Sequence, residues 1–199
     1  MKRLDIEYVK NVARQKGFIL LDNEYKGDRF KMNWIDQEGY KYYATYQTIK
    51  KGIPAKYSKS NPYTIENMNH FFQKHDLDYK YLSGDYINCQ SKLTWIDSQG
   101  YKYYYNFQNM WTNARPVSAY NKYSIDNIRQ YIINNNRKDI LLSTEYKSNG
   151  SKNKEEKLIF QCPDGHIFEK TWNDYQSGQG CRKCIQPYRN LEEFKEEDL

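Results

Sequence analysis

Long apolar runs are missing from this chain of 199 residues. No stretch approaches the roughly 20 apolar residues that a membrane-spanning helix needs. The first residues, Met1-Lys-Arg-Leu-Asp5, contain no apolar signal region either. We therefore expect a cytoplasmic protein with no membrane partner, in which thiols stay reduced and clustered cysteines indicate a metal more often than a disulfide.

Apolar residues are scarce overall. Hydrophobic residues make up 38% of the chain and the mean hydropathy is -1.07, which is low for one core of this size. Several small domains, each stabilised partly by something other than core burial, suit this composition better. The sequence does have 21 tyrosines, and a tyrosine buries its ring while its hydroxyl stays in water.

Residues for catalysis are also few. The three histidines are His70, His75 and His166, and an HNH-type nuclease needs a histidine beside metal-binding carboxylates. Glu24-Tyr-Lys26 and Glu145-Tyr-Lys147 resemble half of a restriction-type nuclease motif, but they share one position of an internal repeat, which favours an architectural role. There is no glycine-rich phosphate loop and no Gly-x-Ser-x-Gly elbow. We expect neither an enzyme nor a small-molecule substrate.

Basic residues are unevenly distributed. The formal net charge is +6, but Arg189–Leu199 contains five acidic and two basic residues. Residues 1–188 therefore hold 29 of the 31 basic and 20 of the 25 acidic residues, a net charge of +9. A basic body suggests a polyanionic partner, although many lysines also serve solubility alone.

Three segments of the chain resemble one another. A first marker ends in a tyrosine, and these tyrosines are 61 and 60 residues apart; it spans Leu20–Tyr25, Tyr81–Tyr86 and Leu141–Tyr146. A second marker follows at Trp34–Tyr43, Trp95–Tyr104 and Phe160–Glu169. An aromatic residue comes next, at Tyr46, Phe107 and Trp172. Three markers in one order indicate an internal repeat.

The repeat predicts an α+β protein of three tandem small modules, each a helix plus a short antiparallel sheet. The helices are expected at about Ile6–Lys16, Ile65–Lys74 and Ile125–Asn135, with Thr64 and Ser124 as N-caps. Two strands, for instance Lys31–Ile35 and Lys41–Tyr46, are joined by a turn with glycine at 39, 100 or 165, and a polar loop follows. The modules span 1–63, 64–123 and 124–188, and 189–199 is an acidic helix or the start of a fourth module.

One set of metal ligands stands out. Cys162, His166, Cys181 and Cys184 have the spacing C-x3-H-x14-C-x2-C, in which a hairpin turn and a knuckle each offer two ligands. Zinc prefers four such ligands in a tetrahedron. Since all four positions are filled by protein, we expect one structural zinc ion with no open position for a catalytic water.

The first two modules lack these ligands. Cys162 aligns with Asp36 and Asp97, His166 aligns with Tyr40 and Tyr101, and Cys181 aligns with Pro54 and Pro116. We expect the first two modules to be stabilised by aromatic packing, among Trp34, Tyr42, Tyr46 and their counterparts Trp95, Tyr103, Phe107. Only the third module then depends on metal.

Residues Ile140–Cys184 resemble a treble-clef-type zinc module. Such modules occur in arrays in phage and mobile-element proteins of Gram-positive bacteria, often attached to homing-type endonucleases. The sequence departs from that pattern at Arg182, where proline commonly follows the third ligand. The resemblance implies DNA binding but not DNA cleavage.

Basic, aromatic and amide residues are interleaved in the segments that follow the third strands. Lys and Arg neutralise phosphates, so we expect double-stranded DNA as the partner, tracked by the tandem modules. The candidate DNA contacts are Lys50, Lys51, Lys56, Trp111, Arg115, Arg182 and Lys183. Two alternatives stay open: the targeting part of an endonuclease, and a phage-encoded protein-interaction module that inhibits a host defence nuclease, of the anti-CRISPR or anti-restriction type.

Overall fold

The structure is a computed structural model that describes residues 4–118, 120–146 and 156–185. It has mixed α+β architecture, with seven helices and three antiparallel three-stranded sheets among these residues. The chain divides into two compact units, Met1–Ser98 with Tyr104–Ala114, and Gln99–Tyr103 with Arg115–Leu199. The module boundaries expected from the sequence stay predictions.

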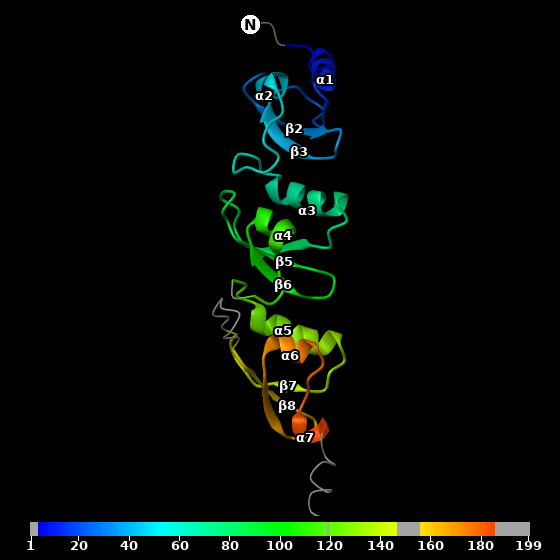
Figure 1. The fold of residues 1–199 in the computed structure, drawn as a ribbon. Helices are drawn as coiled ribbons and strands as arrows, with labels where there is room; N and C mark the ends of the chain where they lie inside the picture. The colour runs from blue at the N-terminus through cyan, green and yellow to red at the C-terminus, as the bar shows by residue number, and fades with distance from the viewer. Residues whose placement is uncertain (1–3, 119, 147–155, 186–199) are drawn as a thin grey trace, which may run out of the picture. The chain divides into compact units, whose positions relative to one another are not determined.

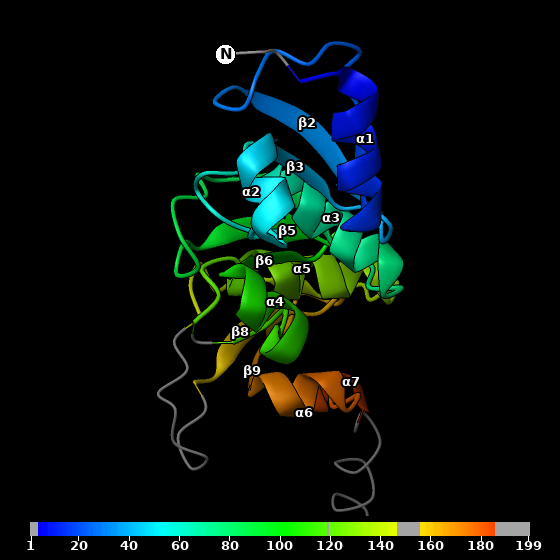
Figure 2. The same ribbon diagram turned by 90° about the horizontal axis from the view of Figure 1, so that it is seen from above.

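The first sheet has the strand order β1-β2-β3. Its elements are α1 (Ile6–Gln15), β1 (Phe18–Leu20), β2 (Lys31–Asp36), β3 (Lys41–Thr45) and α2 (Tyr46–Lys51). Val9 and Ala13 of α1 and Ile49 of α2 are buried in one cluster with Trp34 and Tyr42 of the strands. Both helices therefore cover the same face of this sheet (Figures 1 and 2).

The second sheet has the same strand order, β4-β5-β6. Its elements are α3 (Thr64–Lys74), β4 (Lys80–Ser83), β5 (Leu93–Ile96), β6 (Lys102–Tyr105) and α4 (Phe107–Asn113). Phe72 of α3 packs edge-on against Trp95, with ring centroids 5.2 Å apart, and lies 5.5 Å from Phe107. Aromatic rings thus do the packing that aliphatic side chains do in most cores.

The third sheet has the order β7-β8-β9. Its elements are α5 (Ser124–Asn134), β7 (Ile140–Leu141), β8 (Leu158–Gln161), β9 (Ile167–Lys170), α6 (Trp172–Gln176) and α7 (Arg182–Ile185). Phe160 stacks on Tyr175 at 4.1 Å, and its other neighbour Phe168 lies at 5.5 Å. No helix among the described residues is both long and apolar enough to cross a membrane.

The short helices α2, α4 and α6 correct the sequence prediction of a polar loop after the third strand. Each begins at the aromatic residue Tyr46, Phe107 or Trp172. Each is capped by the preceding Thr45, Asn106 or Thr171, whose side chain accepts a hydrogen bond from a backbone amide three residues on. Lys50 and Lys51 therefore end a helix instead of lying in a loop.

The predicted N-caps Thr64 and Ser124 are wrong. Helices α3 and α5 begin at these residues, and the cap positions are Tyr63 and Tyr123, which make no side-chain cap bond. The Thr64 hydroxyl is buried and donates to the Ser58 and Asn61 carbonyls. Ser124 does the same with the Ser118 and Asn121 carbonyls, so both hydroxyls brace the segment before the helix.

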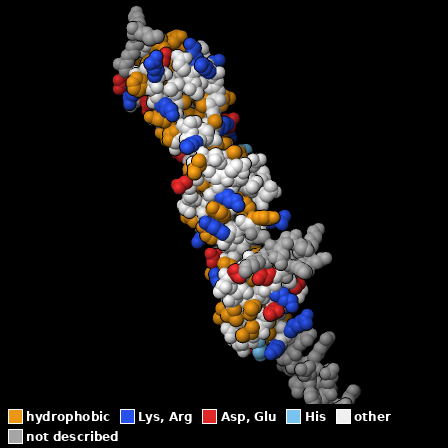
Figure 3. All heavy atoms as spheres, turned by 90° about the vertical axis from the view of Figure 1, so that its left-hand side faces the viewer, with side chains coloured by type: hydrophobic (Ala, Val, Ile, Leu, Met, Phe, Trp, Pro, Cys, Tyr) orange, Lys and Arg blue, Asp and Glu red, His pale blue; other side chains and the backbone are white. Residues whose placement is uncertain are grey.

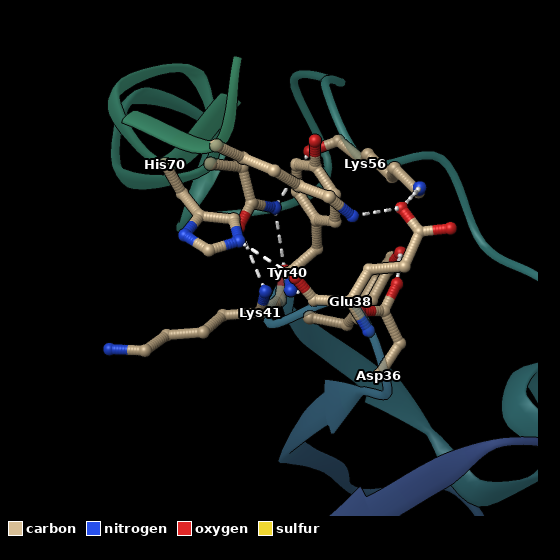
Figure 4. A network of polar contacts seen from close by, with 9 residues as sticks. Asp36, Glu38, Tyr40, Lys41, Lys56 and His70 are labelled. Atoms are coloured by element: carbon tan, nitrogen blue, oxygen red, sulfur yellow. Dashed lines mark hydrogen bonds and ion pairs between the residues drawn. The ribbon is translucent and has the colours of Figure 1, made fainter. Parts of the chain in front are cut away.

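Helix α3 is tied to the hairpin of the preceding sheet by a buried asparagine. The Asn67 amide donates to the Lys41 and Lys56 carbonyls at 2.7 and 2.9 Å, and its oxygen accepts from the Lys41 amide at 2.8 Å. A histidine adds a fourth bond, between His70 Nε2 and the Glu38 carbonyl at 2.8 Å (Figure 4). The β2–β3 turn is thus held by a helix that follows it in the chain.

Ion pairs surround this contact. Glu38 accepts from Lys74 at 3.1 Å and from Lys56 at 3.2 Å (Figure 4). These bonds, with Lys74 first, hold the pKa of the Glu38 carboxyl below its ordinary value of 4.5. Lys56 also lies 4.2 Å from the centre of the Tyr40 ring.

Helix α5 contacts the turn before β6 in the same way. The Asn127 amide donates to the Lys102 and Pro116 carbonyls at 2.6 and 2.5 Å, and its oxygen accepts from the Lys102 amide at 2.8 Å. Asn134 donates to the Gln99 carbonyl at 2.9 Å. An equivalent buried asparagine, Asn67 in α3 and Asn127 in α5, therefore fixes each of the first two hairpins to the helix that follows it.

Candidate metal centre and nucleic-acid interface

The structure brings the four predicted metal ligands together. Cys162 directly follows β8 and His166 directly precedes β9, so the two residues flank the β8–β9 turn. The Cys162 amide donates to the His166 carbonyl at 3.0 Å. Cys181 precedes α7 and Cys184 lies within it, and the Cys184 amide donates to the Cys181 carbonyl at 3.2 Å. A tight turn and a one-turn helix thus present two ligands each.

The ligand atoms are close enough to bind one metal ion, since all four lie within 4.8 Å of one another. The Cys162 and Cys184 sulfurs are 3.4 Å apart, and His166 Nδ1 lies 3.6 and 3.4 Å from them. Zinc–sulfur bonds of about 2.3 Å in a tetrahedron separate two sulfurs by about 3.8 Å. The Cys162 and Cys184 sulfurs are thus slightly closer than in a tetrahedral zinc site, and three sulfurs with one imidazole nitrogen form a donor set that a tetrahedral ion accepts.

The environment of the thiols is uneven. Burial by itself raises the pKa of Cys181, but backbone N–H groups of Cys184 and Lys183 and the neighbouring thiols outweigh it and lower that pKa. The Asp164 carboxylate, 3.2 Å from the Cys184 sulfur, raises the pKa of Cys184, and the Cys162 thiol adds to this. Cys162 and Cys181 are each 5% exposed, whereas His166 and Cys184 are partly exposed.

A basic groove lies beside this cluster. It has a volume of about 400 Å³ and runs between β9, α6 and α7, with Cys181 in its lining. Four basic side chains line it: Lys157, Lys170, Arg182 and Lys183. Two acidic residues, Glu169 and Asp174, also line it. Lys157 lies 3.7 Å from Glu169, and Asp174 is bound to the Gln179 amide at 3.2 Å.

Comparison with protein-family models, with curated proteins and with solved structures finds no match to this chain.

Two of the predicted DNA contacts, Arg182 and Lys183, line the basic groove. Both are exposed, and neither forms an ion pair within residues 4–118, 120–146 and 156–185. Sequence reasoning missed Lys157 and Lys170. One signal was present, because Lys157 falls at the repeat position of Lys31 when Cys162 is aligned with Asp36.

The other predicted contacts lie in the first unit or at the start of the second. Lys50 and Lys51 are exposed at the end of α2, and Arg115 is exposed after α4. Trp111 is 44% exposed, with its ring 5.6 Å from Phe71. Lys56 is held by Glu38 and Tyr40, which indicates a role in packing. On the face drawn in Figure 3, Lys and Arg side chains are interspersed with hydrophobic ones.

The histidines outside the cluster have packing roles in the described chain. The His70 ring packs edge-on against Tyr40 at 4.9 Å, and His75 lies 4.3 Å from Phe71. Among the residues that the structure places, Cys162, His166, Cys181 and Cys184 form the one group of three or more potential metal ligands.

Proposed function

We propose that this chain binds double-stranded DNA, with a single zinc ion as a structural support. In this proposal the chain is an array of three tandem modules of phage or mobile-element origin, and the third is a treble-clef-type zinc module. The observation that carries it is the basic groove beside the ligand cluster, where Lys170, Arg182 and Lys183 converge.

Zinc is supported by the chemistry of the donors. Three sulfurs and one imidazole nitrogen are soft or borderline ligands, which tetrahedral zinc accepts and hard ions such as Mg²⁺ do not. The four ligands leave no coordination position for water, which supports a structural ion over a catalytic one. Whether the chain serves as the targeting part of an endonuclease depends on its partners.

Duplex DNA is supported by the charge of the groove. A row of phosphates requires several cations at one surface, and four basic residues against two acidic ones line this groove. The ligand cluster would fix the backbone that carries Arg182 and Lys183, because they lie between two ligands, Cys181 and Cys184. Lys50, Lys51, Trp111 and Arg115 are further candidate contacts.

The test is DNA affinity as a function of salt concentration. Binding of a labelled blunt duplex is followed by fluorescence anisotropy for the zinc-loaded chain and for Arg182→Gln/Lys183→Gln. Each lost phosphate contact reduces the slope of log affinity against log salt by about 1, so we expect a fall of about 2 and a weaker affinity for every sequence.

A charge-matched control is Arg129→Gln/Lys138→Gln, which removes two exposed cations of the same unit outside the groove. Equal zinc content in both variants shows that the ligand cluster is intact. If the control and the groove variant lose the same affinity, the effect is one of net charge and the groove does not hold DNA.

A protein-interaction module of the anti-CRISPR or anti-restriction type is the second candidate, and one observation favours it. Ile140, Leu142, Ile159 and Ile167 are between 39% and 63% exposed. They share the outer face of the third sheet, opposite the buried Leu141 and Phe160. Exposed aliphatic clusters mark protein interfaces. Replacing Ile140 and Ile159 by Thr would then abolish partner binding and leave DNA affinity unchanged.

A further inference from the structure

The first sheet carries a second groove at the corresponding place in the fold. This tyrosine groove, about 210 Å³ in volume, is lined by Lys31, Tyr43, Thr45, Thr48, Ser58 and Ser60 among other residues. Like the basic groove, it follows an edge strand, here β3, and includes the residue that caps the next short helix, Thr45 here and Thr171 there.

The chemistry of the two grooves differs. Lys31 is the one cation of the described lining of the tyrosine groove, and none of those lining residues is acidic. Tyr43 is 38% exposed, and the Lys31 ammonium lies over its ring at 5.9 Å. At the position of Tyr43 the third sheet has Glu169, which lies near Lys157. The tyrosine groove thus has an aromatic ring next to a single cation, whereas the basic groove has several cations.

The hydroxyls complete this groove. The Ser58 and Ser60 oxygens are 2.9 Å apart, and those of Thr45 and Thr48 are 3.0 Å apart. Hydroxyls both donate and accept hydrogen bonds, so they can bond a phosphate, a sugar or a base edge. The volume is below the roughly 300 Å³ at which pockets for drug-sized ligands begin, which limits the ligand to one small group.

A duplex presents two phosphate rows and keeps the faces of its bases stacked inside. An unpaired nucleotide presents one phosphate and a free aromatic face, and proteins hold it with a cation and an aromatic side chain. The Lys–Tyr pair recurs on the second sheet, where Lys92 lies over the Tyr104 ring at 5.8 Å. We infer that the tyrosine groove binds an unpaired nucleotide of single-stranded DNA, with the base on Tyr43 and the phosphate at Lys31.

The inference rests on the proposed nucleic-acid function but assigns a different ligand to a different groove. The probes are oligothymidine, a blunt duplex, and the same duplex with an oligothymidine overhang. Stacking on an aromatic residue contributes enough affinity that its loss weakens single-strand binding by about tenfold. We expect this loss for Tyr43→Leu with oligothymidine and the overhang, but no change with the blunt duplex.

Tyr43→Phe keeps the ring and should bind oligothymidine as the unchanged chain does. Tyr8→Leu removes an exposed tyrosine of the same unit outside the groove and serves as the matched control. Tyr43 is opposite Asn33 in the register and points away from the core, and thermal unfolding of each variant checks that the fold is kept.

Several outcomes separate the two proposals. Binding of the blunt duplex without oligothymidine binding overturns the tyrosine groove and leaves the basic groove standing. Equal losses in Tyr43→Leu and Tyr8→Leu overturn it as well, as does a co-purified peptide paired along β3 that is lost in Tyr43→Leu. Failure of all three probes to bind overturns the proposed function itself.

Discussion

At the scale of the residue, Tyr46, Phe107 and Trp172 occupy one position, the first residue of α2, α4 and α6. Tyr46 is 1% exposed and packs edge-on against Tyr25 at 6.0 Å. Its hydroxyl is buried and has no hydrogen-bond partner among the described residues, and burial raises the pKa of Tyr46 above its ordinary value. A buried hydroxyl without a partner destabilises the folded state.

We therefore expect Tyr46→Phe to raise the free energy of unfolding by about 1 kcal/mol, since it removes the desolvation cost and keeps the ring. The second sheet already has phenylalanine there. Urea denaturation measures the change, and Tyr42→Phe is the control, because the Tyr42 hydroxyl donates to Asp36 at 2.8 Å and its loss should destabilise. Destabilisation by both changes would mean that the Tyr46 hydroxyl does have a partner.

Individual residues also show how much of the candidate site can be predicted from the sequence. Ligand spacing was enough to find Cys162 and Cys184, because zinc chemistry fixes which residue types occur at which separations. The sequence does not reveal Lys157 and Lys170, because they share a groove with Arg182 only once the chain between Lys170 and Cys181 has folded back beside β9. The sequence predicts Lys56 as a DNA contact but does not reveal its ion pair with Glu38, which is distant in sequence, and the predicted contact stays a prediction.

At the scale of the element, the long helices were predictable and the short ones were not. Helix α3 spans Thr64–Lys74, against an expected Ile65–Lys74, because its apolar residues recur at helical spacing. Helices α2 and α6 have 6 and 5 residues, too few to show a period. The capping residues Thr45 and Thr171 were the available signal.

The buried asparagines make the contact between helix and hairpin testable. Asn67→Asp keeps the size but replaces the donor of two hydrogen bonds by a carboxylate facing two carbonyls. We expect a loss of about 3 kcal/mol in the free energy of unfolding, since several buried polar groups lose their partners. Asn127→Asp should behave alike, because its hydrogen bonds are the same.

Gln73→Ala is the control within α3, since this side chain is exposed and forms no side-chain hydrogen bond among the described residues. Chemical denaturation of all three variants gives the comparison. A cost for Asn67→Asp no larger than that of Gln73→Ala would mean that the helix is held to the hairpin by its apolar face alone.

At the scale of the whole molecule, the first and third sheets differ in their buried clusters and in their potential metal ligands. Among residues 4–118, 120–146 and 156–185, the first has a cluster of twelve buried hydrophobic residues, including Trp34, Tyr42 and Met32, and the cluster of the third has seven. The third sheet also has two of the four potential ligands, Cys162 and His166, at its β8–β9 turn, and the other two, Cys181 and Cys184, lie at α7. The sequence predicts that only the third sheet depends on metal, because Asp36 and Tyr40 stand where the third sheet has Cys162 and His166.

We expect one zinc ion per chain by elemental analysis. Because metal binding contributes directly to the folding of small metal domains, Cys181→Ser should remove amide-exchange protection from β8, β9 and α6 and leave that of β1–β3 intact. Cys89→Ser is the control, as Cys89 is exposed and outside the cluster. About three zinc ions per chain, or a uniform loss of protection across all sheets, would contradict this view.

The asparagine contact also bears on how such a chain gains or loses length in evolution. Asn67 meets the first hairpin and Asn127 the second through the same backbone atoms, at Lys41 and at Lys102. Deletion of residues 64–123 would therefore bring Asn127 to the place of Asn67, with the donors and acceptors of this asparagine matched at Lys41. Recombination between these segments of the gene would then add or remove a whole segment in one step and leave each hairpin in contact with a helix.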